Sequence, residues 1–240
     1  MNLERLALVT GTSTGIGAAV ARELLQHGWH VVGIARRAAP LDMPNYRHLS
    51  LDLADVPTAS AAIERDVGAI LVERTCQRIG LVNNAGVAPA GRARTLDAAE
   101  LLRAYALNAV MPLWLIGFLL KHRLPGTPVR VVNLSSGAAG RPYPGLAAYC
   151  SSKAALRMAG MAVALEDDPD LAILSYGPGT VDTDMQFAVR SVPLEEFPGG
   201  AMFRQFHAEG RLAAPERPAA DIVEFLEADS TDRFTEARRA

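Results

Sequence analysis

Three side chains near the middle of the chain are spaced for proton transfer. Tyr149 and Lys153 lie four residues apart in a stretch that predicts a helix, so they share one helix face. Ser136 follows an apolar run, residues 129–134, that predicts a buried strand. A free tyrosine titrates near ~10, and a nearby cation lowers that pKa. The trio suits proton transfer coupled to hydride transfer, although Tyr-x-x-x-Lys alone is more often an ordinary amphipathic pair.

A glycine-rich turn lies between a predicted strand, residues 6–10, and a predicted helix, residues 18–25. Glycines let the backbone approach a pyrophosphate, and the helix N-terminus offers free N–H groups and partial positive charge. The spacing is Gly-x-x-x-Gly-x-Gly rather than Gly-x-Gly-x-x-Gly, and alone it could mark a structural turn. We expect it to bind a cofactor phosphate. The turn comprises Gly11, Thr12, Ser13, Thr14, Gly15, Ile16 and Gly17.

The second predicted strand, residues 30–35, ends in Ala35 followed by Arg36 and Arg37. An acidic residue at this place would hold the ribose 2′-hydroxyl of NAD, whereas arginine suits the 2′-phosphate of NADP. No carboxylate lies between residues 31 and 41. The sequence therefore predicts NADP(H), with two solvated surface arginines as the alternative.

Together these motifs resemble the short-chain dehydrogenase/reductase family. The resemblance rests on Thr-Gly-x-x-x-Gly-x-Gly at residues 10–17, Asn-Asn-Ala-Gly at residues 83–86, and Ser136 with Tyr149 thirteen residues later and then Lys153. It implies that Tyr149 is the catalytic acid and that Ser136 orients the substrate oxygen. Lys153 would lower the pKa of Tyr149 and bind the nicotinamide ribose.

The resemblance runs from residue 6 to about 184, and more loosely to 226. Asn108 lies 28 residues before Ser136, at the place of the family's fourth catalytic residue, whose backbone carbonyl holds a water that links the lysine to solvent. Asp52 would bind the adenine amine, although it could also cap the next helix. Asn83 would tie the sheet together by side-chain hydrogen bonds, and it is also among the residues predicted to bind the cofactor. The further cofactor contacts that the resemblance implies are Leu53, Ala85, Gly86, Pro178, Gly179, Val181 and Thr183.

The alternation of predicted strands and helices implies an α/β fold: a three-layer, Rossmann-type doubly wound parallel sheet in a single domain, residues 1–240. Residues 58–76 predict one helix, and residues 97–121 predict a long helix kinked at Pro112. The irregular span at residues 186–211 is expected to form a substrate lid at about 184–212. Its aromatic residues could line an apolar pocket or belong to the core; they are Phe187, Phe197, Phe203 and Phe206.

Composition narrows the class of protein. Half of the residues are apolar, and the formal net charge of -2 gives no argument for nucleic acid or an anionic membrane surface. Two cysteines make no disulfide framework. No metal site is expected, because the cofactor carries the difficult step. We expect neither a signal peptide nor a membrane span, and hence a cytoplasmic protein.

The phrase Gly-Pro-Gly-Thr-Val-Asp-Thr-Asp-Met-Gln at residues 177–186 is similar to the sepiapterin reductase and benzil reductase subgroup of the family. The resemblance implies an NADPH-dependent carbonyl reductase that converts a ketone or 1,2-diketone to an alcohol, as a homodimer or homotetramer. The alternatives are a pterin reductase, an NADP-dependent alcohol dehydrogenase and a non-catalytic NADP-binding sensor. Residues 234–240 lack the Gly and Asp of the family's seventh strand, which puts pterin specificity in question.

Overall fold

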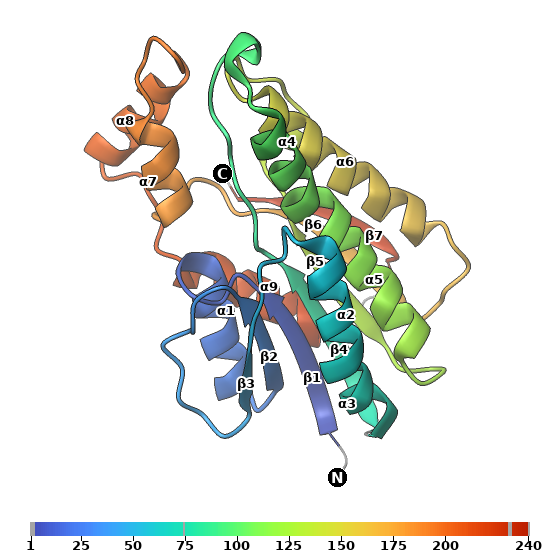
Figure 1. Cartoon of the computed structure of the whole chain (residues 1–240). Coiled ribbons are helices and arrows are strands. Elements are labelled where there is room, and N and C mark those ends of the chain that lie inside the picture. Colours follow the sequence, from blue (N-terminus) through green and yellow to red (C-terminus); the bar gives the residue numbers. More distant parts are fainter. Residues whose placement is uncertain (1–2, 74, 230–231, 240) are drawn as a thin grey trace.

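A seven-stranded parallel sheet forms the centre of the protein, in the order β3-β2-β1-β4-β5-β6-β7. The computed structural model describes residues 3–73, 75–229 and 232–239 (Figure 1). The strand order reverses between β1 and β4, which confirms the predicted doubly wound sheet. The strands are β1 (Leu3–Thr10), β2 (His30–Ala35), β3 (Tyr46–Ser50), β4 (Cys76–Asn83), β5 (Val129–Leu134), β6 (Leu171–Gly177) and β7 (Phe234–Arg238).

Helices cover both faces of the sheet, which gives the predicted three layers (Figure 1). One hydrophobic cluster joins α1 and α9 to one face, and another joins α2, α5 and α6 to the other. The helices are α1 (Gly15–Gln26), α2 (Val56–Asp66), α3 (Gly68–Glu73), α4 (Ala98–Tyr105), α5 (Met111–His122), α6 (Ala147–Ala164), α7 (Asp184–Ser191), α8 (Gly200–Ala208) and α9 (Glu216–Glu227), with the short turns η1 (Ala93–Thr95), η2 (Ala106–Val110) and η3 (Gly137–Ala139).

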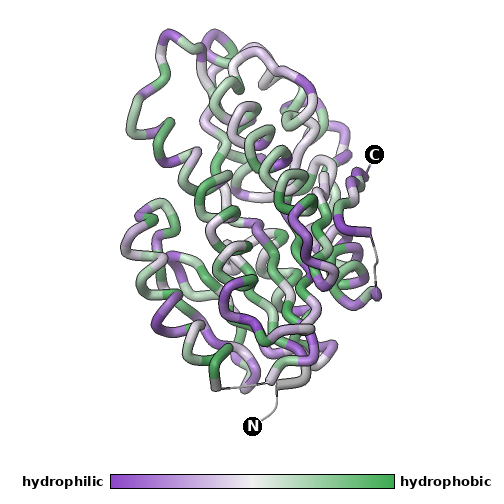
Figure 2. Tube along the Cα trace, turned by 90° about the vertical axis from the view of Figure 1, so that its right-hand side faces the viewer, coloured by the Kyte–Doolittle hydropathy of each residue, from purple (hydrophilic) through white to green (hydrophobic). Residues whose placement is uncertain are grey.

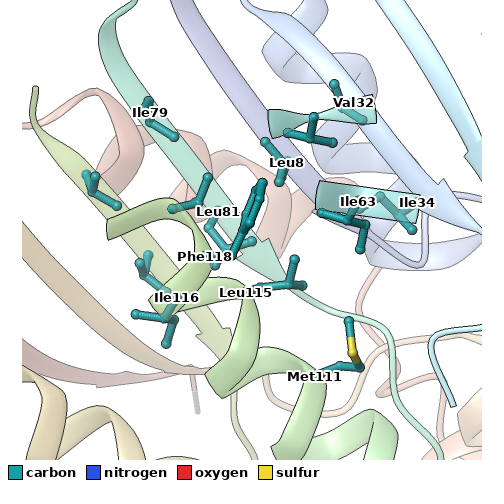
Figure 3. Close-up of a cluster of buried hydrophobic side chains, with 14 of the residues drawn as sticks. Leu8, Val32, Ile34, Ile63, Ile79, Leu81, Met111, Leu115, Ile116 and Phe118 are labelled. Carbon is teal, nitrogen blue, oxygen red and sulfur yellow. The ribbon is translucent and has the colours of Figure 1, made fainter. Parts of the chain in front are cut away.

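Burial on both faces explains the apolar runs of the central strands. Every residue of β5 and β6 is buried, so these strands do not alternate between apolar and polar residues. Leu8 and Leu81 from the sheet pack against Leu115 and Phe118 of α5 (Figure 3). Hydrophobic stretches follow the central strands, while hydrophilic residues gather in the outer turns (Figure 2). This core fixes the strand ends that carry the candidate site.

The predicted helix over residues 58–76 is wrong in its extent. The structure has two shorter helices, α2 and α3, and Cys76 begins β4. Gly68 opens α3, and glycine is a poor helix former in a continuous helix. The carboxylate of Asp55, not that of Asp52, caps α2 by accepting a hydrogen bond from Thr58 N. The alternative reading of Asp52 as a helix cap is therefore wrong.

The predicted long helix is divided into α4, a π-helical turn and α5. The π turn, η2, contains Asn108, and Pro112 stands in the first turn of α5. The irregularity therefore includes the wider π turn as well as the proline. Residues 98–122 are long and apolar enough to pass a composition test for a membrane span, but half of the tested window is buried inside the protein. A core helix has this same composition, so this is weak support for a membrane segment.

One expectation for the C-terminal part is corrected, and the end of the chain has a further feature. Residues 186–211 are not an irregular span, because they hold most of α7 and all of α8. A seventh strand forms although the usual Gly and Asp are missing, and Arg238 of β7 is in parallel register with Gly177 of β6. The backbone of β6 offers a ladder of hydrogen bonds that does not depend on those side chains.

Candidate active site

Two adjoining cavities open where the strands of the sheet end. The smaller, of about 300 Å³, runs from the glycine-rich turn to Lys153. The larger, of about 860 Å³, lies between η3, α7, α8 and the end of β7. Ligands of α/β sheets bind at the carboxyl ends of the strands, beside the reversal of strand order. The two cavities share the lining residues Ile16, Ser135, Tyr149, Pro178, Thr183 and Met185.

The structure brings the predicted catalytic side chains together. Ser136 follows β5 and lines the larger cavity, and Tyr149, in the first turn of α6, lines both cavities. Lys153 is one turn further along α6 and only 4% exposed. Its ammonium donates a hydrogen bond of 2.7 Å to Leu134 O and lies 5.9 Å from the centre of the Tyr149 ring. A hydroxyl, a phenol and an ammonium thus meet where the cavities join.

The pKa of Tyr149 departs from the expectation. Burial raises it above its ordinary value, while the Ser136 hydroxyl, through hydrogen bonding, acts in the opposite direction and the neighbouring Cys150 raises it further. Burial also lowers the pKa of Lys153 to about 8. The expectation that Lys153 lowers the pKa of Tyr149 is not met in this structure, because burial is the largest influence on that pKa and the group that opposes it is the Ser136 hydroxyl. The phenol consequently stays protonated at neutral pH.

Asn108 holds a loop with its side chain. The amide is fully buried, accepts a hydrogen bond of 3.0 Å from Val87 N, and donates to Val87 O at 2.8 Å and to Ser152 Oγ at 3.0 Å. It lines neither cavity. Its backbone carbonyl has a separate feature: the residue four positions later is Pro112, which has no N–H to donate. The usual α-helical partner of that carbonyl is therefore missing.

The glycine-rich turn has the conformation that close approach of a phosphate requires. Gly11 and Gly15 have φ of 75° and 58°, in the left-handed region. A Cβ at Gly17 would lie 2.3 Å from Gly11 O, so only glycine fits there. Thr12 does not line the cavity; it is fully buried, with its hydroxyl 3.2 Å from that of Tyr46. The turn residues that line the smaller cavity are Gly11, Ser13, Thr14, Gly15 and Ile16.

Polar side chains gather at the other end of the smaller cavity. Ala35, Arg36, Arg37, Asp52 and Leu53 all line it, and their assignment to the adenosine end of a cofactor stays a prediction. Burial raises the pKa of Asp52, but hydrogen bonds from Ala54 N and Arg103 bring it below its ordinary value. The Asp52 carboxylate therefore stays ionised and accepts bonds of 3.1 and 3.3 Å from Arg103.

Asn83 and Asn84 have different positions in the structure. Asn83 is buried, and its amide donates a hydrogen bond of 2.8 Å to Asn133 Oδ1, which ties β4 to β5. Asn83 lines neither cavity, so the prediction that it contacts the cofactor is not supported. The expected side-chain hydrogen bond between strands is present. Asn84 lines the smaller cavity and donates 2.8 Å to Thr10 O.

Comparison with known proteins agrees with this geometry. A family model described as short chain dehydrogenase matches residues 5–193. The chain belongs to the short-chain dehydrogenase/reductase family. It is 33% identical to a benzil reductase ((S)-benzoin forming) of Bacillus cereus over 94% of this chain and 95% of that protein. It is 31% identical to the sepiapterin reductase of Meriones unguiculatus over 94% and 92%. The crystal structure of the KRED1-Pglu enzyme matches with a TM-score of 0.80 and 29% identity, over 96% of this chain and all of that one.

Membership fixes the general activity and the kind of cofactor. This short-chain dehydrogenase/reductase is an oxidoreductase of CH–OH and C=O groups, and its family binds a nicotinamide cofactor. The cavities fit such a cofactor. The left-handed backbone at Gly11 and Gly15 lets a phosphate approach the backbone N–H groups at the start of α1. Of the residues predicted further along the chain, Ala85, Gly86, Pro178 and Thr183 line the smaller cavity, whereas Gly179 and Val181 line only the larger one.

Three of the four phenylalanines of this short-chain dehydrogenase/reductase have one or the other of the two expected roles. Phe203 and Phe206 line the larger cavity. Phe197 is completely buried against Leu146 and belongs to the core. Phe187 is 60% exposed and does neither. Phe187 belongs to α7, and Phe203 and Phe206 belong to α8, whereas the sequence predicts no helices in this span.

Sequence reasoning missed Asn84 and Arg103 of this short-chain dehydrogenase/reductase. Asn84 is the second residue of the Asn-Asn-Ala-Gly motif, but the sequence predicts contacts only for the other three residues of that motif. Arg103 lies in α4, 51 residues after Asp52, and reaches that carboxylate only through the fold. No local pattern marks such an arginine, because it stands among ordinary helical residues.

Proposed function

We propose that this chain is an NADPH-dependent carbonyl reductase that converts a ketone or 1,2-diketone, with benzil as the reference compound, to an alcohol. The observation that carries the proposal is the phenol of Tyr149 at the junction of the two cavities, close to Ser136 and Lys153. A raised pKa keeps that phenol protonated, as the reduction of a carbonyl requires.

Each group has a defined task in this scheme. A bound nicotinamide cofactor would supply the hydride to the carbonyl carbon. Tyr149 donates the proton to the carbonyl oxygen, and the hydroxyl of Ser136 orients that oxygen by a hydrogen bond. Lys153 binds sugar hydroxyls from the floor of the smaller cavity, and its charge stabilises the phenolate left on Tyr149. The carbonyl of Asn108, which lacks an α-helical donor, is suited to hold a water that returns the proton.

Arg36 supports the choice of NADPH. It is exposed and lines the smaller cavity beside Ala35, where a carboxylate would otherwise select NAD. Arg37 lines the same cavity but lies 3.6 Å from Asp184, which also accepts a hydrogen bond from Thr14. A 2′-phosphate would therefore meet Arg36 as its principal partner.

The larger cavity supports a carbonyl compound with an apolar body rather than a pterin. Met202, Phe203 and Phe206 of α8 line it, as do Met185 and Val189 of α7, so we assign these helices, at about 184–212, the role of a substrate lid. Within the described residues, no carboxylate lines this cavity to accept hydrogen bonds from the nitrogens of a pterin. Benzil reductase is the name of two relatives, at 33% and 34% identity.

Exposed apolar side chains support self-association. Leu102 of α4 and Met158 of α6 are 74% and 61% exposed. Burial of such side chains against a second copy would be favourable. We infer a homodimer or homotetramer, which sedimentation equilibrium measures directly. The cytoplasmic location stays a prediction.

Substitution of Tyr149 tests the proposed chemistry. In Tyr149→Phe, turnover of benzil with NADPH should fall by at least about 100-fold, because the general acid is lost. The affinity for NADPH, measured by fluorescence titration, should stay close to that of the wild type, and this binding is the control for folding. Turnover within threefold of wild type would remove the mechanism. Binding of NADPH by the wild type without reduction of any carbonyl compound would indicate a sensor instead.

A further inference from the structure

The larger cavity carries charge of one sign. Within the described residues its charged lining side chains are all arginines, although the whole chain has a formal net charge of -2. Arginine stays protonated at physiological pH. Cations gathered in one cavity repel one another and attract an anion. The five residues are Arg141, Arg211, Arg217, Arg238 and Arg239.

Four of these arginines already interact with groups of the protein, and Arg238 differs. Among the described residues, no carboxylate or hydrogen-bond acceptor pairs with its guanidinium, and its side chain is exposed to the cavity. It is therefore the arginine that a ligand would meet first. For the other four, Arg239 pairs with Asp221, Arg211 pairs with Glu209 at 3.2 Å, Arg217 acts electrostatically on Asp221, and Arg141 stacks on the ring of Tyr143.

Two glycines let Arg238 reach the catalytic residues. Arg238 is in register with Gly177, and a Cβ at Gly177 would lie 3.2 Å from Arg238 Cγ. A Cβ at Gly137 would lie 2.8 Å from Arg238 Nη2. The side chain thus crosses the end of β6 and places its guanidinium over Gly137, the neighbour of Ser136. A side chain at Gly177 would press on the stem of Arg238, and a side chain at Gly137 would displace the guanidinium from this place.

We propose that the substrate is a 2-oxo acid with an apolar body and that Arg238 binds its carboxylate, which makes Arg238 a specificity-determining residue. The proposal rests on the proposed carbonyl reductase function and names its substrate class. A 2-oxo acid has two adjacent carbonyl groups, as a 1,2-diketone has. When Ser136 and Tyr149 hold the ketone oxygen, the carboxylate lies one carbon away, on the side of Gly137. A guanidinium binds a carboxylate through two parallel charge-assisted hydrogen bonds.

Two substrates that differ in charge test this assignment. Benzoylformate and 1-phenyl-1,2-propanedione share the phenyl ketone, but the first has a carboxylate where the second has a neutral acetyl group. The measured quantity is the ratio of kcat/KM for the acid to kcat/KM for the dione, with saturating NADPH. In Arg238→Gln this ratio should fall by about 10- to 100-fold, mainly through KM for the acid. Arg238→Lys should restore part of the loss, because the charge remains.

A matched control removes a charge elsewhere at the same edge of the sheet. Arg157 pairs with Glu236 of β7 at 2.5 Å and does not line the larger cavity. Arg157→Gln should keep the wild-type ratio. An equal ratio in wild type and Arg238→Gln, or an equal fall in Arg157→Gln, would overturn the assignment while leaving the carbonyl reductase function in place.

The two levels of the proposal fail separately. If the wild type reduces neither compound, the proposed function fails, and the binding of benzoylformate, measured by calorimetry on the same proteins, then decides the role of Arg238. Binding that disappears in Arg238→Gln would support the anion site. Binding that is absent from the wild type, or equal in both proteins, would overturn it.

Discussion

Replacement of Asn108 by alanine should destabilise the protein strongly. The amide makes three hydrogen bonds, two to the backbone of Val87 and one to Ser152. Ser152 keeps a partner, because its hydroxyl also donates to Tyr149 O at 3.0 Å. The N–H and C=O of Val87 lose theirs, and an unsatisfied group of this kind costs about 1–3 kcal/mol. Val87 is only partly buried, so water recovers some of the loss, and we expect about 2–4 kcal/mol in total.

Equilibrium unfolding in guanidinium chloride, at a fixed protein concentration, measures this loss. For a chain of this size the same loss lowers Tm by about 4–16 °C. Asn45→Ala is the matched control, since the amide of Asn45 makes a single bond of 2.6 Å to Trp29 O. We expect about 1 kcal/mol for the control. A loss in Asn108→Ala no larger than that in Asn45→Ala would refute the view that the amide holds the loop over the smaller cavity.

Three further perturbations address the cofactor, the buried cation and the lid. Arg36→Ala should weaken NADPH binding by about 1.5–3 kcal/mol and leave NADH nearly unchanged; titration with both cofactors checks this, and equal losses would contradict it. Since the pKa of Lys153 is about 8 in the folded protein against 10.5 ordinarily, its burial is unfavourable below pH 8, and this cost disappears as pH rises to 10.5. Between pH 7.5 and 10.5, the unfolding free energy of the wild type should therefore rise by up to about 3 kcal/mol relative to that of Lys153→Met. A difference between the two proteins that does not change with pH would exclude the pKa shift of Lys153. Phe197→Ala should cost about 3–5 kcal/mol by thermal unfolding, while Phe187→Ala, at an exposed site, should cost under about 0.5 kcal/mol; similar losses would mean that α7 and α8 do not form the packing described.

Much of the site was predictable because its chemistry is local. Residues four apart in a helix lie on the same face, as Tyr149 and Lys153 do. The glycine-rich turn uses left-handed backbone at Gly11 and Gly15, which glycine adopts readily. The strands were predictable as well, since a strand buried on both faces needs a continuous apolar run, as β5 has. These properties depend on neighbours along the chain and on no distant contact.

The sequence alone thus determined the family, the parallel α/β architecture and the residue types of the candidate site. Only the tertiary structure decided the direction of the Tyr149 pKa, because desolvation depends on every element packed around the phenol. It also decided that Arg103 meets Asp52 and that Arg238 crosses Gly177 to reach Gly137. Such contacts join residues that are 51 and 101 positions apart, and no periodicity along the chain encodes them. The sequence determines which groups are present, and their packing determines the charges and partners with which they act.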